Sequence, residues 1–103
     1  MSRYYYTYIL TNKNNNVLYI GVTRDLLKRA WEHRNGIHHN SFTKKYNLNK
    51  LVYYEYSESI YAAIAREKQL KGGSRQKKIN LINRFNPKWE NLYLEMAGEN
   101  DEN

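Results

Sequence analysis

Two short runs of aromatic and β-branched residues near the start of the chain, separated by a run rich in asparagine, constrain the fold most strongly. The two runs cover residues 4–11 and 17–22. Aromatic and β-branched side chains favour strands, because they fit a pleated and half-buried surface. The intervening residues 12–16 read Asn-Lys-Asn-Asn-Asn and are typical of a turn, since asparagine tolerates left-handed backbone angles. We therefore predict a β-hairpin at this end of the chain.

Side-chain alternation predicts which hairpin residues face the same way. Tyr8 shares a face with the other even-numbered residues of the first strand, and Tyr19 shares a face with Val17 and Gly21. If the turn holds an even number of residues, Tyr8 and Tyr19 fall on the same face of the hairpin. A slip of one residue in register would separate the two tyrosines.

The sequence after the hairpin predicts a helix, a loop and a third strand. Thr23 is a suitable N-cap for a helix from residue 24 to about residue 34, where apolar residues recur at helical spacing. A loop with a short turn around Phe42 is expected over residues 35–47. A third strand is predicted over residues 50–56, which are rich in aromatic and aliphatic side chains.

Two further helices are expected after this strand. Ser59 caps the first, which runs to residue 71 and ends at Gly72-Gly73, because glycine accepts the left-handed cap position. Ser74 caps the second, which runs to about Phe85 before Pro87 blocks its continuation. The predicted order of elements is β-β-α-β-α-α.

The composition limits the class of protein. A chain of 103 residues is long enough for one domain with one modest core. The absence of cysteine excludes disulfides and thiolate metal sites. No apolar run approaches the roughly 18 residues of a membrane span, and the N-terminus has no signal-peptide hydrophobic region. We expect a soluble, cytoplasmic domain that does not enter a membrane.

Positive charge is concentrated toward the C-terminal half. Residues 1–94 hold all 17 basic residues and six of the ten acidic ones, so we expect a basic folded domain there and an acidic, disordered tail over residues 95–103. The stretch 66–88 carries eight basic residues against one acidic residue. Such a face suits phosphate backbones, while a solubilising surface and an anionic membrane surface stay open as alternatives. The predicted nucleic-acid-binding residues are Arg66, Lys68, Lys71, Arg75, Lys77 and Lys78.

Glu67 interrupts the apolar pattern of the second predicted helix. Ile60, Ala63 and Ile64 set a core-facing stripe, and the next turn of that stripe falls on Glu67. A buried carboxylate is costly unless a cation lies beside it. Three sources of that cation stay open: Lys71 one helical turn on, an arginine from elsewhere in the fold, or a bound metal.

Four other polar residues are candidates to converge on the same place, and each also has a purely structural interpretation. Tyr8 and Tyr19 are consistent with strand packing, and Arg29 is consistent with a solvated helix charge. His33 lies near a helix C-terminus, where a protonated ring would favour the helix dipole. The histidine doublet at residues 38–39 is interpreted as loop, because adjacent side chains splay and no third soft ligand is suitably spaced.

Several short motifs follow one another in order along the chain. They are Tyr6-Thr7-Tyr8-Ile9-Leu10, Tyr19-Ile20-Gly21, Thr23-Arg24-Asp25-Leu26-Leu27-Lys28-Arg29, Glu32-His33, Phe42-Thr43-Lys44-Lys45-Tyr46, Leu51-Val52-Tyr53-Tyr54-Glu55, Ala65-Arg66-Glu67-Lys68-Gln69-Leu70-Lys71-Gly72 and Asn86-Pro87-Lys88-Trp89. Each motif alone is weak, but their order and spacing together resemble the GIY-YIG nuclease superfamily over roughly residues 4–93. The best match is to its short stand-alone members, which are similar to the N-terminal nuclease domain of the excinuclease C subunit.

The resemblance implies a fold, an activity and a set of residue roles. The fold is an α/β (α+β) domain with a small three-stranded antiparallel sheet flanked by helices, in agreement with the predicted element order. The activity is hydrolysis of nucleic-acid phosphodiesters with one divalent metal, Mg²⁺ or Mn²⁺. The matching positions are Tyr8 and Tyr19 for the two motif tyrosines, Arg29 for the helix arginine, His33 for the neighbouring polar residue and Glu67 for the metal ligand.

Two positions match the family pattern less directly. The glycine of the first motif is replaced here by threonine or tyrosine, at a place where the family varies. The late asparagine near the family's active site has three competitors, Asn80, Asn83 and Asn86, of which we select Asn86.

The chemistry of phosphodiester cleavage explains why these residue types would be needed. Glu67 together with the substrate phosphate is enough protein ligation for Mg²⁺, which prefers oxygen ligands and keeps several waters. Arg29 would contact the phosphate as negative charge builds. A tyrosine can take a proton from water only if its pKa falls from about 10, and a nearby arginine and metal would lower that pKa. Tyr8 and Tyr19 both qualify as this base, and His33 would orient or assist it.

The combined prediction is a metal-dependent endonuclease that hydrolyses DNA with low sequence specificity, in DNA repair or recombination. A chain this short leaves no room for a separate DNA-binding domain, so targeting would come from the structure of the DNA or from a protein partner. RNA stays open as a substrate. The alternatives are a non-catalytic nucleic-acid-binding module on the same basic face, and a protein-interaction adaptor whose motif residues serve only packing.

Overall fold

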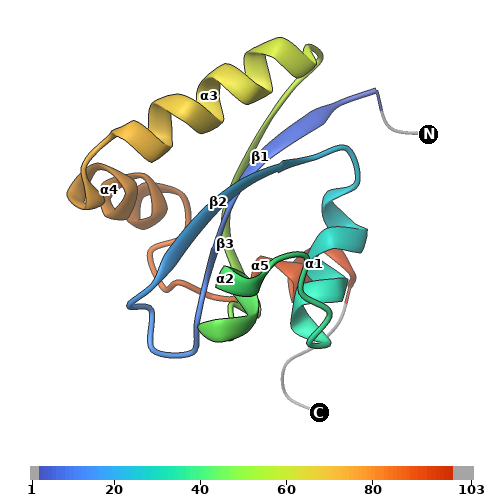
Figure 1. Ribbon diagram of the computed structural model, residues 1–103, viewed down its shortest axis with the longest axis vertical. Helices are drawn as coiled ribbons and strands as arrows, with labels where there is room; N and C mark the ends of the chain where they lie inside the picture. The colour runs from blue at the N-terminus through green and yellow to red at the C-terminus, as the bar shows by residue number, and fades with distance from the viewer. Residues whose placement is uncertain (1–2, 99–103) are drawn as a thin grey trace.

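The computed structural model describes residues 3–98, and within them it contains three strands and five helices (Figure 1). The elements are β1 (Tyr5–Thr11), β2 (Leu18–Thr23), α1 (Leu26–Arg34), α2 (Ser41–Lys45), β3 (Lys50–Ser57), α3 (Ile60–Gly72), α4 (Arg75–Phe85) and α5 (Leu92–Met96). The longer elements confirm the predicted α/β class and the order β-β-α-β-α-α. The short helices α2 and α5 are additional to the three helices that the sequence predicts.

β1 is the central strand of an antiparallel sheet with the strand order β2-β1-β3. Residues 12–17, an even number, connect β1 to β2, so Tyr8 pairs with Gly21 and Leu10 pairs with Tyr19. Tyr8 and Tyr19 therefore lie on the same face of the hairpin, as side-chain alternation predicts. Because β2 is an edge strand, side chains from both faces of the sheet can meet around its outer side.

Helices cover both faces of the sheet (Figure 1). On one face, Tyr8 packs in a cluster with Leu26 of α1 and with residues of α5. On the opposite face, Ile9 packs in a second cluster with Leu70 of α3 and Ile82 of α4. We name these two sides the α1 face and the α3 face.

Polar side chains cap the starts of the long helices. The hydroxyls of Ser59 and Ser74 accept backbone N–H groups of α3 and α4, which confirms both predicted caps. α1 begins two residues later than predicted, because its cap is Asp25, whose carboxylate accepts the N–H of Lys28 at 3.1 Å. Thr23, the predicted cap, instead accepts the N–H of Asp25 at 3.1 Å and so shapes the entry to the helix.

Two helix ends differ from the sequence-based expectation. Gly73 ends α3 with φ −82° and ψ 169°, an extended conformation rather than the left-handed one, and its N–H still bonds the Leu70 carbonyl at 3.1 Å. α5 runs past residue 94, the expected domain boundary, because Leu92 and Tyr93 are buried in the fold. Residues 1–2 and 99–103, which include most of the expected acidic tail, lie outside the described residues. Within residues 3–98, no helix combines the length and the apolar character needed to cross a membrane.

Candidate active site

The phenol ring of Tyr8 lies across Gly21 of the neighbouring strand. Tyr8 is 1% exposed and pairs directly with Gly21 in the antiparallel register. A β-carbon at position 21 would fall 2.5 Å from the Tyr8 hydroxyl oxygen and 2.6 Å from the ring carbon Cζ, closer than real side chains approach. The glycine of the Tyr-Ile-Gly motif therefore makes room for the tyrosine of the first motif.

Arg29 of α1 holds the hydroxyl of Tyr8. Its Nη1 donates a hydrogen bond to the Tyr8 hydroxyl at 3.1 Å. Its Nε lies 3.7 Å from Oε1 of Glu32, and the Arg29 side chain is 29% exposed. Because a guanidinium carries five N–H donors in a planar fork, these contacts leave donors on Arg29 for an anionic ligand.

Burial outweighs Arg29 in setting the pKa of Tyr8. The guanidinium lowers the pKa of Tyr8 through its charge and its hydrogen bond, in the direction that the sequence predicts. Removal of the phenol from water acts more strongly in the opposite direction, and the charges of Tyr19 and Glu67 add to it, so the pKa of Tyr8 is raised above its ordinary value of 10.0. The expected lowering by Arg29 is present, but burial exceeds it, and the expected further lowering by a metal stays a prediction.

The hydroxyl of Tyr19 is held from a different direction. Nδ2 of Asn40 donates to the Tyr19 hydroxyl at 3.1 Å. Oδ1 of the same Asn40 accepts the N–H of Thr43 at 2.9 Å and so caps α2. One amide side chain therefore ties the second motif tyrosine to the start of α2. Sequence reasoning missed Asn40, although an asparagine directly before Ser41 is a recognisable N-cap signal.

His33 of α1 is buried one turn after Arg29 and is neutral near neutral pH. It is 1% exposed, and the ring centroids of His38 and His39 lie 5.5 and 5.3 Å from its own. Burial lowers the pKa of His33 to about 4, and the charges of His39, His38 and Arg29 act in the same direction. The helix-dipole interpretation needs a protonated ring and is therefore wrong near neutral pH. Nδ1 of His33 is buried without a hydrogen-bond partner among the described residues.

Glu67 lies on α3 between the buried residues Ala63 and Leu70. The predicted core-facing stripe is only partly correct, because the Glu67 side chain is 21% exposed and Ile64 is 37% exposed. Nζ of Lys71 lies 3.1 Å from Oε2 of Glu67. Of the three cation sources that the sequence left open, the lysine one turn on is thus in contact with the carboxylate.

Contacts near both ends of α3 hold the helix against β1 and the β1–β2 turn. In the first turns of the helix, Thr7 donates its hydroxyl to the carbonyl of Ala63 at 3.0 Å. Just beyond the helix end, Arg75 donates to the backbone of the β1–β2 turn at 2.9 Å. Glu67 lies between these anchor points, and its charge contributes to the raised pKa of Tyr8, which packs on the opposite face. The charge of Glu67 thus acts on the Tyr8 phenol, although the two side chains belong to elements on opposite faces of the sheet.

Glu67 is the candidate metal ligand, and a second carboxylate, Glu32, lies beside Arg29. Within residues 3–98, no three His, Asp or Glu side chains are grouped to hold a metal ion. Mg²⁺ completes its coordination with waters and substrate phosphate oxygens, so one protein carboxylate fits such an ion. Lys71 is 52% exposed and can turn away from Glu67 into solvent.

Comparison with known proteins identifies the family. A family model described as the GIY-YIG catalytic domain matches residues 4–80. The chain belongs to the GIY-YIG family. The match contains all five candidate site residues, which are Tyr8, Tyr19, Arg29, His33 and Glu67, and it ends before Asn86.

Relatives of the same size support this GIY-YIG membership. A UPF0213 protein of Syntrophus aciditrophicus is 38% identical over 77 residues, which cover 75% of this chain and 87% of the relative. A UPF0213 protein of Clostridium perfringens is 37% identical over 91 residues, which cover 88% of this chain and 96% of the relative. The solution NMR structure of a UPF0213 protein from Bacillus halodurans is similar with a TM-score of 0.55 and 28% identity, covering 88% of this chain and 95% of that one.

Asn86, the selected late asparagine, makes structural contacts outside the GIY-YIG match. It is 6% exposed, and its Nδ2 donates to the carbonyl oxygens of Val52 at 3.1 Å and Glu90 at 2.9 Å. Its Oδ1 accepts the N–H of Glu90 at 3.2 Å. These bonds tie the end of α4 to β3, and a role for Asn86 in the active site stays a prediction.

Several of the predicted nucleic-acid-binding residues are already engaged within the GIY-YIG domain. Nε of Arg66 donates to Oε1 of Glu55 at 2.9 Å, so much of its charge is compensated. Nζ of Lys78 donates to the Gly73 carbonyl at 2.8 Å, while Arg75 and Lys71 make the contacts given above. Lys68 and Lys77 are exposed and so are better placed to meet a phosphate backbone.

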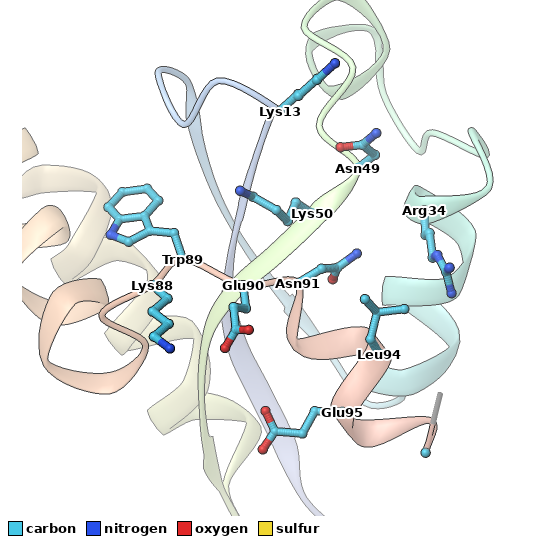
Figure 2. Close-up of a pocket in the computed structure, with 11 residues that line it drawn as sticks. Lys13, Arg34, Asn49, Lys50, Lys88, Trp89, Glu90, Asn91, Leu94 and Glu95 are labelled. Atoms are coloured by element: carbon cyan, nitrogen blue, oxygen red, sulfur yellow. The ribbon is translucent and has the colours of Figure 1, made fainter. Parts of the chain in front are cut away.

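A broad surface pocket of this GIY-YIG domain lies apart from the candidate site. It has a volume of about 1090 Å³ and is lined by side chains that include Lys50, Arg34 and Trp89 (Figure 2). None of the five candidate site residues lines it. A smaller cleft of about 490 Å³ lies beside Arg29, at the end of β2 and the start of α3. Of the five candidate site residues, Arg29 lines this cleft, and Glu32 and His39 line it beside Arg29.

Proposed function

We propose that this chain is a metal-dependent endonuclease that hydrolyses phosphodiester bonds of DNA with low sequence specificity. The observation that carries the proposal is the Tyr8 phenol packed on Gly21 with Arg29 bonded to its hydroxyl, in a domain of a nuclease superfamily. A buried tyrosine hydroxyl needs a hydrogen-bond partner in any case, but a charged guanidinium as that partner also favours the deprotonated phenol that a general base requires.

Arg29 would bind the scissile phosphate. Its side chain borders the 490 Å³ cleft and keeps N–H donors beyond the one used on Tyr8. A guanidinium can bind two phosphate oxygens at once, and the attraction grows as negative charge builds on the phosphorus centre. Arg29 would thus hold the phosphate within reach of the Tyr8 hydroxyl.

Tyr8 and Tyr19 are the candidates for the general base that activates water. Each hydroxyl accepts a hydrogen bond, from Arg29 and from Asn40 respectively, and such bonds favour a deprotonated phenol. Burial raises the pKa of Tyr8, so Tyr8 can act as a base only where added positive charge offsets that burial. His33 would act as a positioning residue, since its neutral ring is buried one turn from Arg29.

Glu67 would be the protein ligand for Mg²⁺ or Mn²⁺, a role that its half-buried position near β2 and its carboxylate chemistry fit. When bound, a divalent cation supplies charge neutralisation at the phosphate and stabilises the leaving oxygen. Lys71 would leave the carboxylate and remain in solvent, at small cost because an exposed ion pair contributes about 0–1 kcal/mol. The single carboxylate leaves the remaining coordination to water and substrate.

The basic residues on α3 and α4 would hold the DNA backbone. Lys68 and Lys77 are exposed, and together with Lys71, Arg75 and Lys78 they form the proposed contact surface. Such contacts carry no base information, so selection would depend on the structure of the DNA or on a protein partner. We place the activity in the cytoplasm, in DNA repair or recombination.

The test is a cleavage assay with supercoiled, branched and single-stranded DNA and RNA, with and without Mn²⁺. Glu67→Ala is expected to abolish metal-dependent cleavage while the far-UV circular dichroism stays unchanged. Glu58→Ala removes an exposed carboxylate just before the same helix and is expected to cut normally. Equal turnover by the Glu67→Ala protein and the wild type would refute the proposal.

A second candidate function is a nucleic-acid-binding module that does not cut. The contact of Lys71 with Glu67 and the raised pKa of Tyr8 favour this alternative. It predicts salt-sensitive binding to nucleic acid and no product at any Mg²⁺ or Mn²⁺ concentration. The same assay therefore separates the two functions.

A further inference from the structure

The helix α2 exposes its aromatic residues and buries a polar one. Thr43 is 0% exposed, and its hydroxyl donates to the carbonyl of Asn40 at 3.1 Å. Phe42 is 42% exposed and Tyr46, at the end of the helix, is 37% exposed. Surface helices of globular proteins usually show the reverse arrangement, with the apolar residues inward. The aromatic rings of α2 are therefore only partly used to hold the fold together.

The exposed rings continue a row that begins in the candidate active site. The ring centroids of Tyr19 and Phe42 lie 6.1 Å apart with an angle of 33° between the planes. Those of Phe42 and Tyr46 lie 4.9 Å apart with an angle of 56°. Asn40 fixes the row in place, because it caps α2 and also binds the Tyr19 hydroxyl. The two exposed rings thus lie directly beside one of the proposed bases.

The surroundings of this row are positively charged. Nζ of Lys45 lies 5.3 Å from the centre of the Tyr46 ring, and Lys44 is exposed next to it. The sequence contains no acidic residue from position 33 to position 54. Aromatic faces beside cations match a ligand that combines flat rings with a negative backbone. A surface for an ordinary protein partner would not need this uniform charge.

We propose that Phe42 and Tyr46 stack on an unpaired nucleobase next to the phosphodiester held at Arg29 and Tyr19, so that the site selects single-stranded segments of DNA. This inference rests on the proposed nuclease function and narrows its substrate class. In a duplex each base is stacked between its neighbours, so its face cannot reach the rings of α2. A single strand, a flap or an unpaired end offers such a face.

The test measures binding in the absence of metal, so that it does not depend on cleavage. Fluorescence anisotropy is followed for a short labelled oligothymidylate and for a blunt duplex of equal length. Phe42→Ala is expected to weaken binding of the single strand by about five- to 150-fold, because one base–aromatic stack is lost. Binding of the duplex should stay within about twofold of the wild type, because its bases do not reach Phe42. Phe42→Leu keeps apolar volume without an aromatic face and should lose most of the same affinity.

Tyr61→Ala is the matched control, because Tyr61 is 82% exposed in the first turn of α3, well away from α2 in Figure 1. It should bind both probes like the wild type. A strand with one abasic position opposite Phe42 should bind the wild type and the Phe42→Ala protein equally. Three results would contradict the proposed stacking site. The first is that Phe42→Ala weakens single-strand and duplex binding to the same degree. The others are that Tyr61→Ala also weakens single-strand binding, or that Phe42→Ala does not weaken it. If the proposed nuclease function is wrong, the cleavage assay shows it independently, because no cleavage will depend on Glu67.

Discussion

The two faces of the sheet bury overlapping but different sets of side chains. The α3 face buries aliphatic residues such as Ile9, Val52 and Ile82, each 0% exposed, together with the phenol of Tyr53 at 7%. The α1 face buries a phenol and an imidazole, Tyr8 and His33, each 1% exposed. Burial raises the pKa of Tyr8 and lowers the pKa of His33, so both groups are held neutral. Both faces bury aliphatic residues that stabilise the fold, and the α1 face in addition holds Tyr8 beside the candidate site.

The largest expected effect on stability lies on the α3 face. Ile82→Ala should lower the free energy of unfolding by about 2–5 kcal/mol, because it removes buried methyl groups and leaves a cavity. Urea denaturation measures this change. Leu27→Ala, at a position 46% exposed on α1, is the control and should cost much less. Similar losses from both variants would show that the burial of Ile82 does not stabilise the fold.

The largest expected effect on activity lies at the contact between β1 and β2. Gly21→Ala places a methyl group within 2.5 Å of the Tyr8 hydroxyl oxygen, so the ring must move away from Arg29. Cleavage should fall by about a hundredfold, as expected for a misplacement of about 1 Å in an active site. Gly72→Ala is the matched control, since a β-carbon there meets nothing within 4 Å. Unchanged cleavage by the Gly21→Ala protein would remove Tyr8 from the proposed mechanism.

The buried imidazole predicts a pH dependence of stability. Because the pKa of His33 is about 4 in the fold against 6.5 in the unfolded chain, the unfolded state binds the proton more readily between these values. Stability is therefore complete above about pH 6.5 and falls as the pH drops toward 4, by about 1–2 kcal/mol near pH 5. Urea denaturation at several pH values measures the slope. His33→Gln should flatten it, and an unchanged slope would show that other groups cause it.

Much of the fold was predictable from local chemistry. The hairpin and the serine caps of α3 and α4 follow from strand and capping preferences, whereas the shared face of Tyr8 and Tyr19 follows from strand alternation only once the turn is known to hold an even number of residues. α5 was not predictable, because five residues carry too little periodicity, and its burial depends on contacts with distant elements. The start of α1 was misplaced since Thr23 and Asp25 are both good caps, and only the backbone geometry selects between them.

The candidate site was predictable in its residue types but not in its energetics. The spacing of the motifs identifies Tyr8, Arg29 and Glu67, whereas the sign of the pKa shift of Tyr8 depends on how completely the ring leaves water. The contact of Asn40 with Tyr19 joins residues 21 positions apart, and no local pattern encodes it. The close approach of Tyr8 to Gly21 likewise depends on the strand register.

The smallest expected effect concerns the ion pair of Glu67 with Lys71, which connects the comparison of the two faces to the candidate metal ligand. Glu67 belongs to the helix of the α3 face, yet its charge acts on Tyr8 of the α1 face. If its ion pair with Lys71 is an ordinary helix-surface contact, a double-mutant cycle with Glu67→Ala and Lys71→Ala should give a coupling of about 0.3–0.5 kcal/mol that shrinks with added salt. Urea denaturation of the four proteins measures it. A coupling of about 3 kcal/mol or more, typical of a buried pair, would instead assign Glu67 to the stability of the fold and argue against its role as the metal ligand.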